Sequence, residues 1–154
     1  MDPIEIFHHV ITVGKSDLDD NDHVNNVRYV QWMQDAASRH ARKLGWPVDR
    51  LQALGLAWVV RSHWIEYHRP ARLGDEITVQ TWVAGFQKVR SPRRYRFLGP
   101  GGRTQLARAE TDWVMVHAAS GRPAPIPAEL IADFPVVAPD REPGARKIDE
   151  GRMR

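Results

Sequence analysis

The sequence predicts a single α+β domain in which one long apolar helix packs against an antiparallel sheet of about five strands. One segment repeats apolar residues every three or four positions, as a buried helix does. A β-rich segment precedes it and further ones follow, separated by turn residues. A sheet of strands joined by tight turns and facing one helix is an α+β layer arrangement. The length of 154 residues suits one domain with a substantial core.

The first strand and the long helix come first in the chain. Residues 4–13 are rich in β-forming types and partly alternate, which predicts a strand. After a polar loop, Asn25 or Asn26 can cap the helix, because an Asn side chain accepts from the unpaired N–H groups of the first turn. The helix carries two apolar stripes, one of Val27, Val30, Met33, Ala37, Ala41 and Leu44, the other of Tyr29, Trp32 and Ala36. More than half of its circumference therefore requires burial before Gly45 and Pro47 end it.

The remaining strands follow the helix. After a connector with a short helix at 48–54, alternation predicts strands at 57–68, 75–89, 93–98 and 104–118, and a short helix can form at 127–134. Neither face of 57–68 is purely apolar, which suits a strand with a ligand or a subunit on one side. One helix cannot cover both faces and both edges of such a sheet. We therefore expect association with another copy.

Composition narrows the class of protein further. The chain has no Cys, which excludes disulfides and thiolate chemistry, and its seven His show no metal-ligand spacing, so no cofactor is expected. A net charge of +3 gives no support to nucleic-acid binding. No signal peptide or membrane-spanning stretch is recognised, so we expect a soluble cytoplasmic protein with no membrane partner. Residues 1–136 form the predicted domain, and 137–154, rich in Pro, Gly and charges, are predicted to be a disordered tail.

The most informative stretch is the polar loop before the helix, which in Asp17–Tyr29 has the sequence D-L-D-D-N-D-H-V-N-N-V-R-Y. This ordered pattern resembles the motif of hotdog-fold acyl thioesterases, both the 4-hydroxybenzoyl-CoA thioesterase group and the acyl-acyl-carrier-protein thioesterases. A second match, H-R-P-A-R-L-G-D-E-I-T-V at His68–Val79, resembles a strand corner of the same families. The resemblance covers roughly residues 4–135 and implies a sheet wrapped around the helix, with two copies joining their sheets. The sequence departs from the pattern at Asp22, where many relatives carry Gly.

The resemblance implies hydrolysis of an acyl-CoA or acyl-carrier-protein thioester to free acid and thiol, in fatty acid metabolism. Such a reaction needs an activated water or a carboxylate nucleophile, together with donors for the developing oxyanion. Asp19 matches the family's catalytic carboxylate, as general base or nucleophile, and the backbone N–H of Asn26 matches the oxyanion donor at a helix N-terminus. In the acyl-carrier-protein pattern Asp19, Asn21 and His23 act together. Asn21 and His23 could also be ordinary turn residues, and Asn26 an ordinary cap.

Other residues are candidates for substrate binding. Tyr29 and Trp32 are expected in the core or in a pocket wall. His63 could reach a site from a neighbouring subunit of a homodimer or homotetramer, or be buried at the interface. A basic cluster is predicted around a turn between two strands, with the members Lys88, Arg90, Arg93, Arg94 and Arg96. The first four are the candidates for binding substrate. Guanidinium groups suit the phosphates of coenzyme A or an acidic carrier protein, whereas the structural alternative is a solvated hairpin.

Two other functions are weighed against hydrolysis. A hotdog enoyl-thioester hydratase or dehydratase also uses Asp, Asn and His, typically as D-x-N-P-x-H. Here Asp19–His23 is one residue shorter and lacks the Pro, so this function ranks second. A non-catalytic acyl-thioester-binding module would bind without turnover. Hydration of an enoyl thioester, release of free thiol, and binding alone distinguish the three functions.

Overall fold

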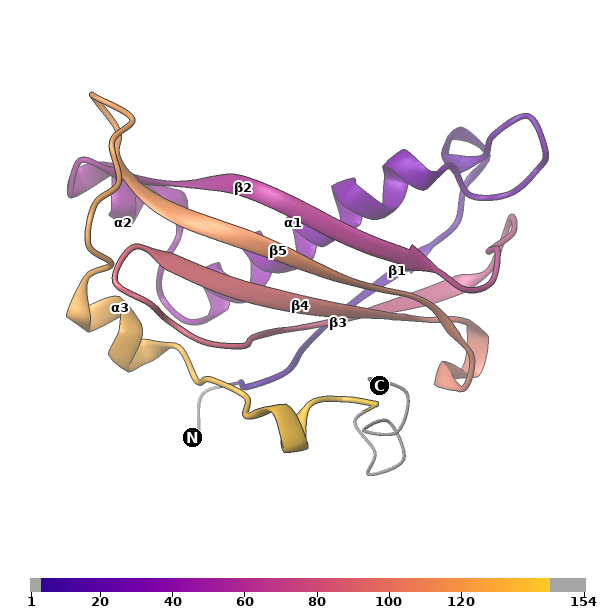
Figure 1. The fold of residues 1–154 in the computed structure, drawn as a ribbon. Coiled ribbons are helices and arrows are strands. Elements are labelled where there is room, and N and C mark those ends of the chain that lie inside the picture. The colour runs from indigo at the N-terminus through magenta and orange to yellow at the C-terminus, as the bar shows by residue number, and fades with distance from the viewer. Residues whose placement is uncertain (1–3, 145–154) are drawn as a thin grey trace.

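The computed structural model describes residues 4–144 and has the predicted α+β architecture, with the long helix α1 on one face of a five-stranded antiparallel sheet (Figure 1). The elements in chain order are β1 (Phe7–Thr12), α1 (Asn26–Lys43), α2 (Val48–Ala53), β2 (Leu56–Tyr67), β3 (Glu76–Val83), β4 (Arg90–Leu98), β5 (Gln105–His117) and α3 (Ala128–Asp133). Single 3-10 turns occur at η1 (Lys15–Asp17), η2 (Pro100–Gly102) and η3 (Pro139–Arg141). Among the described helices, none has both the length and the apolar character that crossing a membrane requires.

The order of the strands across the sheet is β1-β3-β4-β5-β2. The last three strands are consecutive in the chain and pair as hairpins, β3 with β4 and β4 with β5. The first two strands pair with the outer members, so β1 and β2 form the two edges. The edge strand β2 is 12 residues long and exposes Val59, Trp64 and Tyr67. A long, partly apolar edge of this kind offers unpaired backbone groups to another strand.

Helix α1 begins as predicted, because the Oδ1 atom of Asn25 accepts a hydrogen bond from the Val27 N–H at 3.0 Å. Its buried face consists of Tyr29, Trp32, Met33, Ala36, Ala37 and His40. Val27, which the sequence pattern places in an apolar stripe, is instead 70% exposed. At 3.6 residues per turn, Val27 and Tyr29 lie almost on opposite sides of the helix. Burial of Tyr29 against the sheet therefore turns Val27 outward.

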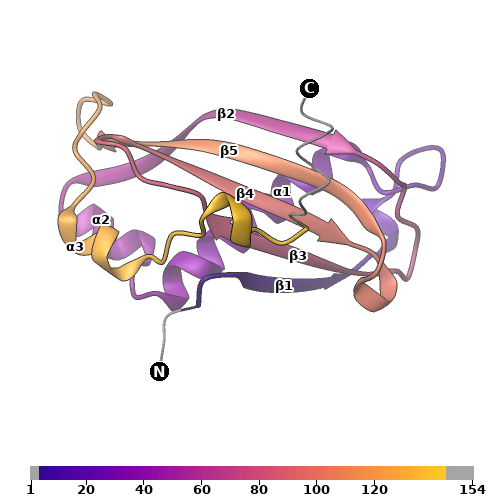
Figure 2. The same ribbon diagram turned by 60° about the horizontal axis from the view of Figure 1, so that its bottom comes forward.

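The C-terminal segment differs from the predicted disordered tail over residues 137–144, because this part packs on the sheet. Figure 2 shows it crossing the face opposite α1. Val137 is fully buried, and its N–H donates to the Val83 carbonyl at 3.0 Å. The Glu142 carboxylate accepts from the Trp82 indole N–H at 2.7 Å and from Arg94 at 2.7 Å and 2.8 Å. The rest of the predicted tail, 145–154, lies outside the described residues.

Replacing Glu142 with Ala is expected to lower the free energy of unfolding by about 1–3 kcal/mol, because the change leaves the buried Trp82 N–H without its acceptor. Urea denaturation followed by Trp fluorescence measures this effect. Asp140→Ala is the matched control, since Asp140 lies in the same segment but is exposed. Equal unfolding free energies for the two variants would show that the segment contributes little to stability.

Candidate active site

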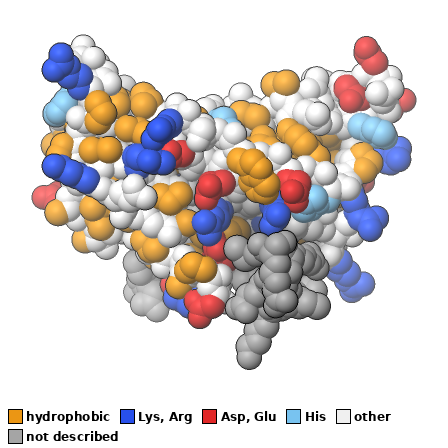
Figure 3. All heavy atoms as spheres, in the orientation of Figure 1, with side chains coloured by type: hydrophobic (Ala, Val, Ile, Leu, Met, Phe, Trp, Pro, Cys, Tyr) orange, Lys and Arg blue, Asp and Glu red, His pale blue; other side chains and the backbone are white. Residues whose placement is uncertain are grey.

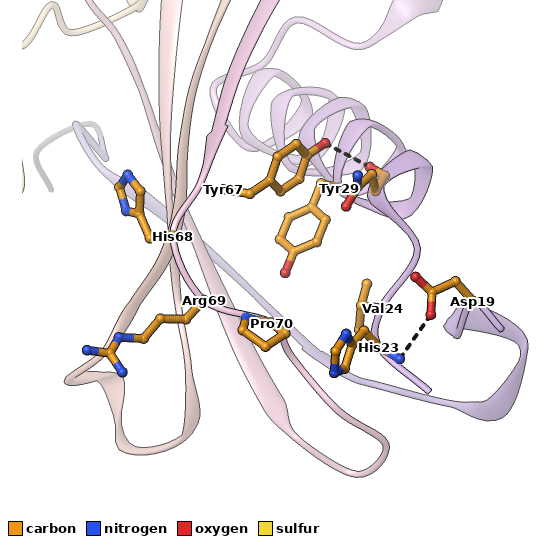
Figure 4. Close-up of a pocket in the computed structure, with 9 residues that line it drawn as sticks. Asp19, His23, Val24, Tyr29, Tyr67, His68, Arg69 and Pro70 are labelled. Carbon is orange, nitrogen blue, oxygen red and sulfur yellow. Dashed lines mark hydrogen bonds between the residues drawn. The ribbon is translucent and has the colours of Figure 1, made fainter. Parts of the chain in front are cut away.

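A pocket of about 220 Å³ opens where the polar loop meets the start of α1 and the end of β2 (Figure 4). Its lining residues are Asp19, His23, Val24, Asn26, Tyr29, Tyr67, His68, Arg69 and Pro70. Two contacts hold these distant segments together. The Val24 N–H donates to the Ala71 carbonyl at 2.9 Å, and the Tyr67 hydroxyl donates to the Asn26 carbonyl at 3.1 Å. The pocket thus combines a carboxylate, a helix N-terminus and the two Tyr side chains.

Asp19 is held by its own loop. Its Oδ1 atom accepts from the N–H groups of Asn21 at 2.9 Å and His23 at 3.1 Å. Its backbone N–H donates to the His23 carbonyl at 2.7 Å, which closes the loop into a tight turn. The second oxygen, Oδ2, makes no hydrogen bond to any described residue. One oxygen of Asp19 therefore orders the loop while the other is available to a ligand or water in the pocket.

The backbone of Asp22 explains the departure from the family pattern at this position. Asp22 has a φ of 60°, in the left-handed region, and is the only non-glycine residue with positive φ between residues 4 and 144. Glycine adopts this conformation without steric cost, whereas Asp tolerates it at some cost. Asp22 thus occupies a left-handed turn position for which glycine is the residue of lowest steric cost.

The start of α1 presents an unpaired donor to the pocket. The N–H of Val27 is used by the Asn25 cap, and the N–H of Arg28 donates to the Asn25 carbonyl at 2.9 Å. The N–H of Asn26 makes no hydrogen bond within the described chain. The N-terminus of a long helix carries a partial positive charge, so this N–H suits an oxyanion or another anionic group.

A second carboxylate fixes the loop to the helix. The Oδ2 atom of Asp17 accepts from the Gly14 N–H at 2.9 Å, and its Oδ1 atom pairs with Arg28 Nε at 2.7 Å. The Asp17 carbonyl accepts from the Asn25 N–H at 2.8 Å. Asp17 is thereby engaged in holding the start of the loop against the first turn of α1, which positions Asp19 relative to Asn26.

Two Tyr residues form the apolar part of the wall. The rings of Tyr29 and Tyr67 meet edge to face with centroids 5.1 Å apart, and Tyr29 also packs against Phe97. The Tyr29 hydroxyl points into the pocket (Figure 4). Burial, with smaller contributions from Tyr67 and Asp75, raises the pKa of Tyr29 to about 12. Tyr29 is therefore a neutral hydrogen-bond donor at ordinary pH.

Apart from the basic cluster, three predicted site residues lie outside this pocket. Asn21 is exposed and contributes only its backbone N–H to Asp19. Trp32 is buried in the core and packs edge to face on Tyr29 at 5.6 Å. His63 lies on β2 with its Nδ1 atom 2.8 Å from Thr111 Oγ1, and burial lowers its pKa. Asn21 and Trp32 thus contact pocket residues, Asp19 and Tyr29 respectively, without lining the pocket themselves.

The predicted basic cluster is dispersed by the structure, and none of its members lines the pocket. The strand predicted at 75–89 ends at Val83, which leaves Lys88 in an exposed loop. Arg90 makes two hydrogen bonds to Asp112, and Arg94 pairs with Glu110 and Glu142. Figure 3 accordingly shows acidic and basic groups interspersed on this face.

Arg93, the last of the four binding candidates in this cluster, points into the core. Its Nη1 atom lies 3.0 Å from both His40 Nδ1 and Thr81 Oγ1. Alternation along β4 separates it from Arg90 and Arg94, so neighbours in sequence become a core residue and two surface ion pairs. The local sequence could not reveal this, because the acidic partners come from β5 and the C-terminal segment.

The mixed faces of 57–68 indicated a ligand or a subunit beside this strand, but the sequence pattern did not identify which of its residues line the pocket. Tyr67, Arg69 and Pro70 line it, but only the second motif, which begins at His68, marked this corner. The second motif could have indicated these residues, because it begins directly after the end of the predicted strand and so marks a loop with a defined position. The contact of Tyr67 with Asn26 depends on the fold, because these residues are 41 positions apart.

Comparison with known proteins identifies relatives along most of the chain. Residues 13–134 match the thioesterase-like superfamily. The acyl-CoA thioester hydrolase YbgC of Escherichia coli O157:H7 is 27% identical over 129 residues, which cover 84% of this chain and 96% of YbgC.

Solved structures show the same fold. The 1,4-dihydroxy-2-naphthoyl-CoA thioesterase Slr0204 from Synechocystis has a TM-score of 0.77 at 20% identity, covering 83% of this chain and 94% of Slr0204. The hypothetical protein SAV2348 from Staphylococcus aureus, determined in complex with CoA, has a TM-score of 0.78 at 19% identity, covering 92% and 88%. These similarities confirm the predicted hotdog fold.

Proposed function

Because the chain belongs to the thioesterase-like superfamily, we propose that it hydrolyses an acyl-CoA-type thioester to a free acid and a thiol. The observation that carries this proposal is the pairing, in one pocket, of the Asp19 carboxylate with the unpaired Asn26 N–H at a helix N-terminus. Thioester hydrolysis needs a group that activates water or attacks the carbonyl, and a donor for the oxyanion. The name of YbgC and the CoA complex of SAV2348 support coenzyme A as the carrier.

In the proposed reaction the thioester carbonyl lies between Asp19 and the start of α1. The Oδ2 atom of Asp19 takes a proton from water as the water oxygen attacks, or attacks the carbonyl itself to form an anhydride that water then cleaves. In both routes the Asn26 N–H and the helix dipole stabilise the negative charge on the carbonyl oxygen. In the general-base route the C–S bond breaks when the tetrahedral intermediate collapses, and in the nucleophilic route it breaks as the anhydride forms, before water attacks. In both routes the thiolate leaves and takes up a proton to give the free thiol.

Other residues of the pocket have positioning roles in this proposal. Asn21 and His23 donate their backbone N–H groups to Asp19 Oδ1 and so direct Oδ2 away from the loop. Tyr67 holds the Asn26 carbonyl and with it the orientation of the first helical residue. Tyr29 offers a neutral donor from the wall. Of the four binding candidates in the basic cluster, Lys88 stays a candidate for a carrier phosphate, since Arg90, Arg93 and Arg94 are engaged in the fold.

A panel of acyl-CoA esters tests this function through release of free thiol. The panel includes short and long alkyl chains, aromatic acyl groups and an enoyl-CoA, and matched acyl-carrier-protein substrates distinguish the carrier. Hydrolysis of at least one ester supports the proposal. Hydration of the enoyl-CoA without thiol release would instead identify a hydratase, and binding without either reaction would identify a binding module.

We also propose that the active molecule is a homodimer or homotetramer with its sites at subunit interfaces. No strand within residues 4–144 pairs with the outer edge of β2, and Val59 and Trp64 on this strand are 43% and 48% exposed. Pairing of this edge with a second copy would cover these groups. The same strand carries Tyr67 into the pocket, which couples assembly to the site.

Introducing charge on this edge is expected to shift the protein toward monomers. In Val59→Lys/Trp64→Lys, two apolar contacts become like charges that face each other across the proposed interface. Light scattering at micromolar concentration measures the mass, and thiol release measures activity. Val48→Lys, at a 62% exposed position on α2, is the control. A fully active wild-type monomer would refute this assembly.

A further inference from the structure

Several basic side chains near the pocket are already paired with acidic groups of the same chain. Arg28 pairs with Asp17 at 2.7 Å, and Arg108 pairs with Glu66 at 3.1 Å. His68, which lines the pocket, is also committed, because its Nε2 atom lies 2.6 Å from Glu66 Oε1. Each of these three side chains is therefore already engaged with a carboxylate of the same chain.

Arg69 is different. It lines the pocket, is exposed, and forms no ion pair and no side-chain hydrogen bond with any residue between 4 and 144. Its backbone is nevertheless well placed, since its N–H donates to the Leu106 carbonyl at 3.1 Å and Pro70 follows directly. Figure 4 shows Asp19 and Arg69 on opposite sides of the pocket, with the Arg69 side chain extending away from Asp19. Arg69 thus has a well-placed backbone, and its guanidinium, which no described residue neutralises, lies on the side of the pocket opposite the carboxylate.

We propose that Arg69 binds the phosphate of the phosphopantetheine arm that carries the acyl group. This inference rests on the proposed thioesterase function and locates the carrier relative to the reacting bond. With the thioester at Asp19 and Asn26, the arm leaves the pocket past Pro70, and its phosphate emerges beside Arg69. A guanidinium fork matches phosphate oxygens in charge and geometry. The same phosphate occurs in coenzyme A and on a carrier protein, so Arg69 serves either carrier.

The test compares an acyl-CoA with the N-acetylcysteamine thioester of the same acyl group, which has no phosphate. Arg69→Ala is expected to raise KM for the acyl-CoA roughly three- to tenfold at low salt, the range for an exposed charge-assisted contact, and to leave kcat unchanged. KM for the phosphate-free thioester should not change. The salt dependence of KM for the acyl-CoA should also become shallower. An acyl-carrier-protein substrate in a third arm shows whether both carriers use Arg69.

Arg72→Ala is the matched control, since Arg72 is an exposed arginine of the same loop that does not line the pocket. An equal rise in KM for both thioesters of Arg69→Ala would show that Arg69 is only a wall residue and would overturn the inference. If Arg72→Ala raises KM for the acyl-CoA as much as Arg69→Ala does, the effect comes from general surface charge and the inference is overturned.

Calorimetric binding of coenzyme A itself separates this inference from the proposed activity. Weaker binding to Arg69→Ala, without any thioester hydrolysis by the wild type, would retain the phosphate site and reject the activity. If the wild type hydrolyses the thioester, but Arg69→Ala changes neither KM nor coenzyme A binding, the activity is retained and the phosphate site is rejected.

Discussion

Replacing Asp19 with Asn is expected to lower kcat by roughly two to four orders of magnitude, the contribution of a positioned acid–base group. The change is conservative for the loop, because an Asn Oδ1 atom can still accept from the N–H groups of Asn21 and His23. It removes the second carboxylate oxygen, which in the proposed reaction takes the proton or attacks the carbonyl. Thiol release under saturating substrate measures kcat, and substrate binding should persist.

The matched control for this prediction is Asp20→Asn. Asp20 is the exposed neighbour of Asp19 and does not line the pocket, so its amide should retain most of the activity. A melting temperature close to that of the wild type must accompany the loss in Asp19→Asn, since otherwise the loss reports folding. Near-normal turnover in Asp19→Asn, together with complete loss in His23→Ala, would make His23 the general base. No effect of either change would remove the loop from the reaction.

Acidification is expected to lower the free energy of unfolding through His40. Burial and then the Arg93 guanidinium lower the pKa of this imidazole, whereas its hydrogen bond to the Ile4 carbonyl raises the pKa by less. The net effect is a fall in the pKa from 6.5 to about 4. Above pH 6.5 the side chain is neutral in both states. Between pH 6.5 and 4 the unfolded chain binds a proton that the folded chain does not, so stability falls as the pH falls. The loss amounts to about 3 kcal/mol across this window.

Urea denaturation at pH 7, 5.5 and 4.5 measures this dependence. His40→Gln can still accept from Arg93 and donate to the Ile4 carbonyl but does not titrate, so its stability should fall less steeply with pH. His117→Gln, at an exposed position, controls for loss of any imidazole and should follow the wild type. Parallel curves for wild type and His40→Gln would assign the acid sensitivity to other groups.

The sequence alone determined the features that depend on neighbouring residues. The period of apolar residues placed α1, and its Asn cap and Gly stop set its ends within a residue or two. Alternation and turn residues located all five strands, although 75–89 was extended past Val83, because strand-like residues continue where pairing stops. The motif around Asp19 marked the loop that lines the pocket, since its chemistry is encoded in consecutive positions.

The tertiary structure decided whatever depends on partners distant in the chain. Glu142 and the residues before it pack on the sheet because Trp82 and Arg94 supply a donor and a counter-charge, although the composition resembles that of a disordered segment. Strand pleating sent Arg93 into the core and left Arg94 outside, and Tyr67 reached Asn26 only through the position of β2. Local patterns specify which elements form. The pairing energy between elements, which no local pattern contains, specifies which side chains remain free to bind a ligand.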